Sequence, residues 1–298
     1  MAQFHQEAQV FAVIKWGTRK APHFMILNGP EYKRAIEDLF TIVDKSSRIV
    51  PFKLNSIQDK YLTQDASGRD VILKSRQQGF SSVILAIFTI DFLLKENTRS
   101  VIVADNSDNA SELLDRVKFY IKSFEEKIGQ KQPMKYNSKY ELYNESNGSR
   151  YTIGTAENKD IGRSKTITNL HLSEFALYPD AERLFAGIMQ AVVPEGRVVI
   201  ETTAQGFNFF ESFWRECTLG IRPFKPLFYP ASSFYDSEFL DNKKKELGRL
   251  FDQEYPESAT LAFLLSGNPY FEPEALRFYA ENIKEPIKEG MILTPVPL

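Results

Sequence analysis

The sequence has few of the residues that build disulfide or metal scaffolds. Among its 298 residues there is one cysteine, Cys217, and there are three histidines. A single cysteine excludes an internal disulfide framework and a zinc site with several cysteine ligands, and it fits a reducing cytosol. The N-terminus lacks the apolar core of a signal peptide, and no segment has the roughly 18 consecutive apolar residues that cross a membrane. We therefore expect a cytoplasmic protein without a membrane anchor.

The composition is that of an ordinary globular protein. Hydrophobic residues make up 43% of the chain and charged residues 26%, so a substantial core is expected in one large or two small domains. The net charge is −2. This balance gives no general signal of nucleic-acid binding, which usually needs a basic domain.

Apolar runs alternate with helical patterns between residues 70 and 202. Strands are indicated at 71–73, 101–104, 151–153, 167–172 and 198–201. Helices are indicated at 82–95, 110–128 and 181–192. Residues 139–153 are typical of a β-hairpin. The alternation predicts an α/β fold whose central sheet is mostly parallel and flanked by helices, with ligands bound at the carboxyl ends of its strands.

We divide the chain into three parts. Residues 1–50 form an N-terminal helical extension, and residues 51–220 form the α/β core. Residues 221–298 form a small linker or lid subdomain, because several prolines interrupt the pattern there. Outside the core, helices are expected at 31–43, 237–247 and 274–283.

Residues 74–82, Lys-Ser-Arg-Gln-Gln-Gly-Phe-Ser-Ser, join the first strand of the core to a helix. A strand, a short turn with one glycine, a hydroxyl pair and an apolar helix form the layout of a phosphate-binding loop, or P-loop. Backbone N–H groups and the dipole at the helix start favour an anion. The usual pattern, G-x-x-x-x-G-K-[ST], is broken twice, since Lys74 replaces the first glycine and Phe80 the lysine. The loop is therefore either a working variant or a relic.

Two further strand ends carry polar groups. Ser173 and Glu174 follow the fourth apolar run, where an ATPase needs a metal-side group and a carboxylate that activates the attacking water. Thr202, Thr203 and Gln205 follow the fifth run, where hydroxyl and amide groups can sense the γ-phosphate. Each pattern alone is also typical of a strand that ends in a polar turn. Beside a P-loop in the same sheet, both favour a nucleotide site.

Gln58 and Arg163 complete the set of candidates. Gln58 lies about one helix before the P-loop, and its amide can donate to and accept from an adenine edge. Arg163 lies in a loop before Glu174, from which an arginine finger could reach the γ-phosphate of a neighbouring subunit. In isolation, each residue is more often an ordinary surface side chain.

Together these motifs resemble the ATPase domain of the large terminase subunits of tailed bacteriophages, the motors that package DNA. The resemblance covers roughly residues 50–275 and rests on Gln58 and on the segments Arg76–Ser81, His171–Ala176, Glu201–Gly206 and Glu254–Pro256. It implies a P-loop NTPase fold and an ATPase that translocates double-stranded DNA into a procapsid. It also implies ATP and Mg²⁺ as cofactors and the host cytoplasm as the location. The implied partners are further copies in a ring, the portal protein and the small terminase subunit.

The resemblance implies roles for the residues of the loop. Terminase motors often carry a displaced P-loop cation, so Arg76 is expected to bind phosphate through its fork of donors, with Lys74 either a second cation or a cover for the sheet edge. Ser81 and Ser173 are the expected metal-side residues, although Ser173 stands where the family has an aspartate. The nucleotide-binding set is Gln58, Lys74, Ser75, Arg76, Gln77, Gln78, Gly79, Phe80, Ser81 and Ser82; within it, Phe80 is expected to pack.

Two other functions stay open at this point. A two-lobed helicase has similar motifs but needs a second motor lobe, for which too few residues follow Gly206. A degenerate nucleotide-binding scaffold is favoured by Phe80 and Ser173. Family members usually carry a nuclease domain as well. We expect none in this chain, because the acidic residues after Gly206 lack an alternating strand pattern around them.

Overall fold

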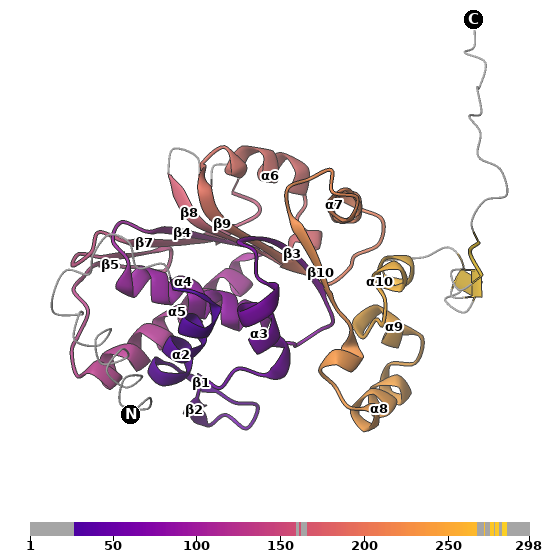
Figure 1. Ribbon diagram of the computed structural model, residues 1–298, viewed down its shortest axis with the longest axis horizontal. Coiled ribbons are helices and arrows are strands. Elements are labelled where there is room, and N and C mark those ends of the chain that lie inside the picture. The colour runs from indigo at the N-terminus through magenta and orange to yellow at the C-terminus, as the bar shows by residue number, and fades with distance from the viewer. Residues whose placement is uncertain are drawn as a thin grey trace, which may run out of the picture.

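An eight-stranded sheet lies at the centre of the computed structural model (Figure 1). The structure describes residues 27–158, 161, 166–266, 271, 275–276, 278–279 and 282–284. The strand order is β10-β3-β9-β8-β4-β7-β6-β5. The six strands from β10 to β7 run parallel, and β6 and β5 extend the sheet in antiparallel pairings.

The strands alternate with helices along the chain, which is why most of the sheet is parallel. The strands of the central sheet are β3 (Arg69–Lys74), β4 (Arg99–Ala104), β5 (Met134–Asn137), β6 (Glu141–Asn144), β7 (Arg150–Thr155), β8 (Ile167–Ser173), β9 (Val192–Thr202) and β10 (Lys225–Tyr229). A separate antiparallel pair is formed by β1 (Thr41–Val43) and β2 (Ile49–Pro51).

Helices near the N-terminal end of the described chain cover one face of the sheet (Figure 1). They are α2 (Gly29–Leu39), α3 (Ser56–Lys60) with its π-helical extension η1 (Tyr61–Asp65), α4 (Phe80–Leu94) and α5 (Ser107–Ile128). Every residue of α4 from 83 to 93 is buried, because this apolar helix packs between the sheet and the other helices. Tyr32 of α2 donates a hydrogen bond to buried Asp91 of α4. Leu27 and the buried residues of α2 therefore belong to the same hydrophobic core as α4 and the sheet.

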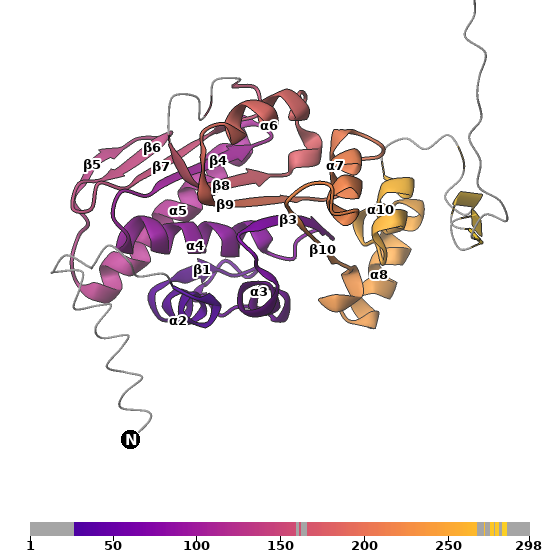
Figure 2. The ribbon, with the colours of Figure 1, turned by 45° about the horizontal axis from the view of Figure 1, so that its top comes forward.

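The opposite face is covered by η2 (Phe175–Leu177), α6 (Ala181–Met189) and α7 (Phe209–Thr218) (Figure 2). Phe175 is fully buried and contacts a ring of aromatic side chains, among them Tyr178, Phe185 and Phe213. This cluster holds the turn that follows β8, and the turn carries Glu174.

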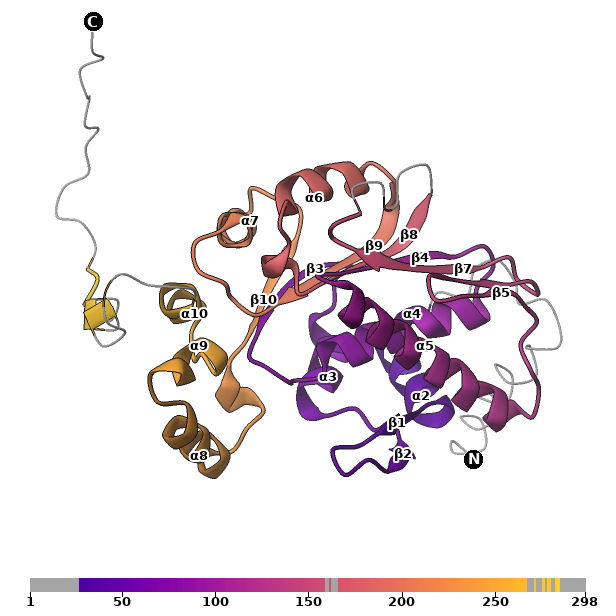
Figure 3. The same ribbon diagram turned by 180° about the vertical axis from the view of Figure 1, so that it is seen from behind.

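A group of short helices lies beside the β10 edge of the sheet (Figure 3). It comprises η3 (Ala231–Ser233), α8 (Ser237–Leu247), η4 (Gly248–Leu250), α9 (Phe251–Glu254) and α10 (Ala259–Leu265). Tyr235, Phe251 and Tyr255 form a small apolar cluster of their own, whereas Phe263 of α10 packs into the main core. We call residues 231–265 the C-terminal subdomain. Within the described residues, no helix combines the length and apolar character needed to cross a membrane.

The predicted α/β class with a mostly parallel sheet is confirmed. All five apolar runs form parallel strands, and the expected hairpin is the antiparallel pair β6–β7. The three helical patterns of the core correspond to α4, α5 and α6, and the helix expected at 237–247 is α8. Of the helix expected at 274–283, the structure describes 275–276 and 278–279, which are helical, and 282–283, which are not.

Two local expectations differ from the structure. The helix predicted at 31–43 ends at Leu39, and residues 41–43 form β1 instead. The proline-rich stretch after residue 220 contains β10, which the sequence pattern does not indicate. Pro226 is tolerated there because β10 is an edge strand that pairs only with β3, so one missing N–H donor costs little.

Replacing Phe175 by alanine tests the aromatic cluster. Phe175→Ala should lower the free energy of unfolding by about 3–5 kcal/mol, because it leaves a cavity among several rings. Phe207→Ala is the matched control. Its ring is 70% exposed, so its loss should change stability by about 0.5 kcal/mol or less. Equal effects in urea denaturation would show that Phe175 does not organise this face.

Candidate functional site

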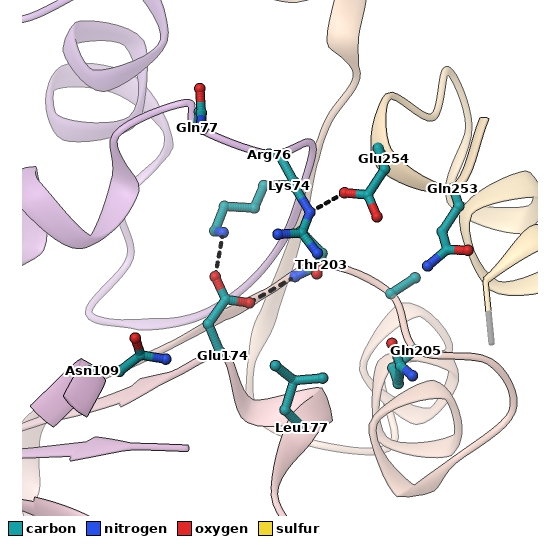
Figure 4. A pocket seen from close by; sticks show the side chains of 11 residues that line it. Lys74, Arg76, Gln77, Asn109, Glu174, Leu177, Thr203, Gln205, Gln253 and Glu254 are labelled. Carbon is teal, nitrogen blue, oxygen red and sulfur yellow. Dashed lines mark hydrogen bonds and ion pairs between the residues drawn. The ribbon is translucent and has the colours of Figure 1, made fainter. Parts of the chain in front are cut away.

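The carboxyl ends of β3, β9 and β8 lie side by side, and the segments that follow them meet around a cavity of about 280 Å³ (Figure 4). The C-terminal subdomain closes one side of this cavity through Gln253 and Glu254. Among the predicted site residues, those that line it are Lys74, Arg76, Gln77, Glu174, Thr203 and Gln205.

The backbone of the P-loop has the form that an anion site needs. Gly79 has a φ of +81°, which favours glycine, and a Cβ there would lie 2.6 Å from Nε2 of Gln58 and displace that side chain. Gln77 also has a positive φ, of 58°. The first turn of α4 receives no side-chain cap. Its N–H groups are therefore available to phosphate oxygens, and the helix dipole favours them.

Lys74 faces into the site and does not cover the sheet edge. Its side chain is 7% exposed, and Nζ lies 3.0 Å from Oε1 of Glu174 and 3.1 Å from Oε2 of Glu201. Burial opposes the charged form, but the two carboxylates outweigh burial and raise the pKa of Lys74. A permanent positive charge thus stands at the end of β3.

Glu201 of β9 is fully buried at the centre of this cluster. Its Oε1 accepts hydrogen bonds from the hydroxyls of Ser81 (2.9 Å) and Ser173 (2.7 Å), and it lies 3.3 Å from Nε2 of His171. Burial would raise the pKa of Glu201, but the charge of Lys74 and the hydrogen bond with His171 outweigh burial and lower it. The group is therefore ionised.

Sequence reasoning gave Glu201 no role. The signal that could have found it is a carboxylate within an apolar strand. Its contacts depend on strand register, because Glu201 lies opposite Ser173 of β8 and Ile72 of β3. That register is not visible in the sequence.

Glu174 occupies the turn after β8 in a left-handed conformation, with a φ of 55°. A non-glycine residue in this conformation costs roughly 1–3 kcal/mol, and such strain is common at functional sites. Its Oε2 accepts hydrogen bonds from the Thr203 N–H and the Thr202 hydroxyl, both at 3.4 Å. The turn thus aims the carboxylate into the cavity (Figure 4) and joins it to the end of β9.

Arg76 pairs with the C-terminal subdomain. Its side chain is 60% exposed and forms an ion pair with Glu254 of α9. The backbone N–H of Arg76 donates to the Glu254 carbonyl (3.2 Å), and the Tyr235 hydroxyl donates to the Arg76 carbonyl (2.8 Å). The predicted phosphate-binding cation therefore lines the cavity, but in this conformation its charge is paired with a carboxylate.

The remaining side chains of the loop mostly hold it in place. Gln78 donates through Nε2 to the carbonyls of Tyr229 (3.3 Å) and Pro230 (3.1 Å), and Ser82 accepts from Nη1 of Arg116 (3.2 Å). Phe80 is buried against the rings of Tyr61 and Tyr229, so its predicted packing role is confirmed. Ser75 is buried, and its hydroxyl has no hydrogen-bond partner among the described residues.

Gln58 contacts the loop from α3. Its Nε2 donates to the Gly79 carbonyl (2.7 Å), and its Oε1 accepts from the Asn55 N–H (3.0 Å). Both ends of the amide are thus bonded to the chain in this conformation, and adenine recognition by Gln58 stays a prediction. Arg163 lies outside the described residues.

The donors and charges of the cavity fit a magnesium nucleotide. The Lys74 ammonium lines the cavity and can serve phosphate oxygens, and the uncapped N–H groups of α4 follow the loop that contributes Arg76 and Gln77 to the lining. Among the described residues, no group of three or more His, Cys, Asp and Glu side chains could hold a metal alone. Mg²⁺ does not need one, since it keeps several waters and binds through one or two carboxylates plus phosphates.

The buried ion pairs of Lys74 can be tested through stability. Lys74→Met should lower the free energy of unfolding by about 3–5 kcal/mol, because Glu201 would stay buried without its cation. Lys53→Met is the matched control. Its exposed pair with Glu37 should contribute about 1 kcal/mol or less. If both variants lose the same stability in urea denaturation, Lys74 does not form the pairs described above.

Comparison with known proteins places the fold. No protein-family profile matches the sequence. The ATPase domain of the Thermus phage P74-26 large terminase matches 70% of this chain and 94% of its own, with a TM-score of 0.55 and 18% identity. The large terminase of bacteriophage HK97 matches 77% of this chain and 53% of its own, with a TM-score of 0.60 and 14% identity.

A further match is the large terminase of a thermophilic bacteriophage in complex with ATP-gamma-S. It covers 68% of this chain and 51% of its own, with a TM-score of 0.51 and 11% identity. The chain thus spans about half the length of this protein and of the HK97 protein. The structure confirms the resemblance predicted from the motifs: the chain has the P-loop NTPase fold of the ATPase domains of bacteriophage large terminases.

Proposed function

We propose that this chain hydrolyses ATP with Mg²⁺ and couples hydrolysis to the movement of double-stranded DNA into a viral procapsid. One observation carries the proposal. A buried cation, a P-loop hydroxyl and a strand-end carboxylate, contributed by Lys74, Ser81 and Glu174, meet at the carboxyl edge of one parallel sheet. This combination is what phosphoryl transfer requires, because its catalysis is mostly positioning and charge stabilisation.

The matched structures support a nucleotide at this site. The large terminase of the thermophilic bacteriophage, which shares the fold, is known in complexes with ADP and with ATP-gamma-S. In this chain, Lys74 and Arg76 are the cations that line the cavity. We assign Lys74 to the phosphates in the present conformation, and Arg76 once it leaves Glu254. Bound Mg²⁺ would neutralise developing charge on the phosphate oxygens.

Glu174 is the general base of the proposal. Its carboxylate lines the cavity and is 28% exposed, so water can reach it. The Thr203 N–H donates to Oε2, and the Thr202 hydroxyl lies 3.4 Å from the same oxygen, so both residues help to orient the carboxylate. A base held in this way can accept a proton from an attacking water without first reorganising.

The segment after β9 would couple ATP hydrolysis to movement of the C-terminal subdomain. Thr202 contacts both Glu174 and the N–H of Ala176, so it senses the turn that carries the base. A few residues on, the Gly206 N–H donates to the Ser266 hydroxyl (2.7 Å), just after α10. We propose that Thr202, Thr203 and Gln205 relay hydrolysis along this path to the C-terminal subdomain.

The assembly and partners of the motor are also proposals. Copies of the chain would form a ring in the cytoplasm of the host, with double-stranded DNA, the portal protein and the small terminase subunit as partners. An assay of ATP turnover by the wild-type chain separates this function from a degenerate scaffold, which would bind nucleotide without turnover.

DNA cleavage by this chain would refute the expected lack of nuclease activity.

Removing the charge of Glu174 tests the chemistry. Glu174→Gln should lower kcat by about 10²- to 10⁴-fold, because the amide cannot take the proton from water. The Kd for ATP should stay within a few-fold of the wild-type value. Glu182→Gln, an exposed substitution on α6, should leave both quantities unchanged. Steady-state turnover and equilibrium titration measure the two effects, and unchanged turnover in Glu174→Gln would sink the assignment.

Mixed assemblies test the role of Arg163. Arg163→Ala should lower turnover by roughly 10³- to 10⁵-fold if it acts as an arginine finger. Subunits that carry Glu174→Gln but keep Arg163 should restore turnover to Arg163→Ala subunits when the two are mixed. Mixtures that stay as inactive as their components would argue against a contribution from the neighbouring subunit.

A further inference from the structure

We propose that Glu201, on β9, supplies the carboxylate that holds Mg²⁺ in this site, in place of the strand-end aspartate that Ser173 replaces on β8. The inference rests on the proposed ATPase function and deepens it. In P-loop ATPases, the metal is held by the P-loop hydroxyl and by an aspartate at the end of a neighbouring strand. Here the hydroxyl is present in Ser81, but the strand-end residue has no charge.

Strand register brings Glu201 to the required place. Glu201 lies directly opposite Ser173 in the parallel pair β8–β9. Neighbouring strands are roughly 4.8 Å apart, and a glutamate side chain is one methylene longer than an aspartate, so it can reach across toward the adjacent strand end. The contact is observed, since the Ser173 hydroxyl donates to Oε1 of Glu201 over 2.7 Å.

The P-loop hydroxyl touches the same oxygen. Ser81 donates to Oε1 of Glu201 over 2.9 Å. One carboxylate oxygen therefore joins the two residues between which the metal is expected. Glu174 shares the ion pair with Lys74, but its other hydrogen bonds run to Thr202 and Thr203 and not to the two serines. We therefore assign the two carboxylates different roles. Glu201 lies beside the proposed metal position, and Glu174 lies beside the proposed position of the attacking water.

The charge balance also favours a bound cation. Among the described residues, Lys74 is the only lysine or arginine within ion-pair distance of either carboxylate. Two carboxylates thus outnumber the one ammonium of this largely buried cluster, whose other polar side chains are Ser81, Ser173 and His171, with Nε2 of His171 3.3 Å from Oε1 of Glu201. Buried charge is costly unless it is paired or coordinates a metal.

Moving the charge between strands tests the proposal. The measurement is the ratio of the ADP dissociation constants without and with Mg²⁺, obtained by calorimetry, together with turnover. We call this ratio the metal-dependent gain in ADP affinity. Glu201→Gln should lower it by about 10- to 100-fold, while ADP binding without Mg²⁺ persists. The double variant Glu201→Gln with Ser173→Asp should recover most of the gain, because it returns a carboxylate to the same space from β8. Glu174→Gln should keep the gain and lose turnover.

Each outcome separates the hypotheses. A Glu201→Gln variant that keeps the full metal-dependent gain overturns the inference but leaves the ATPase proposal intact. A double variant that regains stability but not the gain assigns Glu201 a structural role only. A wild-type chain that neither binds nor hydrolyses ATP refutes the proposed function itself.

A second substitution covers the case in which Glu201→Gln does not fold. Glu201→Asp keeps the charge that pairs with Lys74 but withdraws the carboxylate by one methylene. Its thermal stability should stay near that of the wild type, while its metal-dependent gain in ADP affinity falls by about tenfold. A gain equal to the wild-type value in the folded Glu201→Asp variant would overturn the proposal.

Discussion

The buried contact of Lys74 with Glu201 and Glu174 is the constraint on which the site depends. Charges removed from water are tolerated only when opposite charges and hydrogen bonds surround them. These contacts require the carboxyl ends of β3, β9 and β8 to lie close together, because the three side chains come from three different strand ends. The aromatic cluster around Phe175 then fixes the turn after β8, which holds Glu174 in its strained conformation. Packing on one face of the sheet thus sets the electrostatics at its edge.

The same loop is also held from the other side, by the C-terminal subdomain. Lys74 forms its ion pairs with carboxylates at the strand ends of the sheet. Arg76, two residues later, forms an ion pair with Glu254, and its carbonyl accepts a hydrogen bond from Tyr235. Any nucleotide that draws Arg76 toward its phosphates must compete with Glu254 for the guanidinium. Under the proposed function, that competition would link occupancy of the cavity to the position of α9. Since binding can shift an equilibrium only through differential contacts, the Arg76–Glu254 pair supplies a physical basis for movement of the subdomain.

The sequence carried enough information for the sheet and for most of the cavity lining, but not for the contacts within the cavity. Strong apolar periodicity marked β3, β8 and β9, and polar residues after them marked the edge where ligands bind. The prolines around β10 concealed an edge strand. The partner of Arg76 lies far along the chain, and the role of Glu201 depends on a register that pairs it with Ser173. Such pairings arise from tertiary structure, so local patterns could not reveal them.

A motif that looks defective along the chain has further charged groups beside it in the folded protein. Along the sequence, Ser173 leaves the metal without an acid and Phe80 leaves the phosphates without a lysine. In the folded protein, Glu201 places a carboxylate against the Ser173 hydroxyl, and Lys74 places an ammonium at the same edge. Under the proposed roles, a charge stays at this edge of the sheet while the residue that carries it changes. Coulombic stabilisation depends on distance and burial, not on which strand supplies the group, so a parallel sheet whose strand ends share one edge can exchange such groups between neighbours.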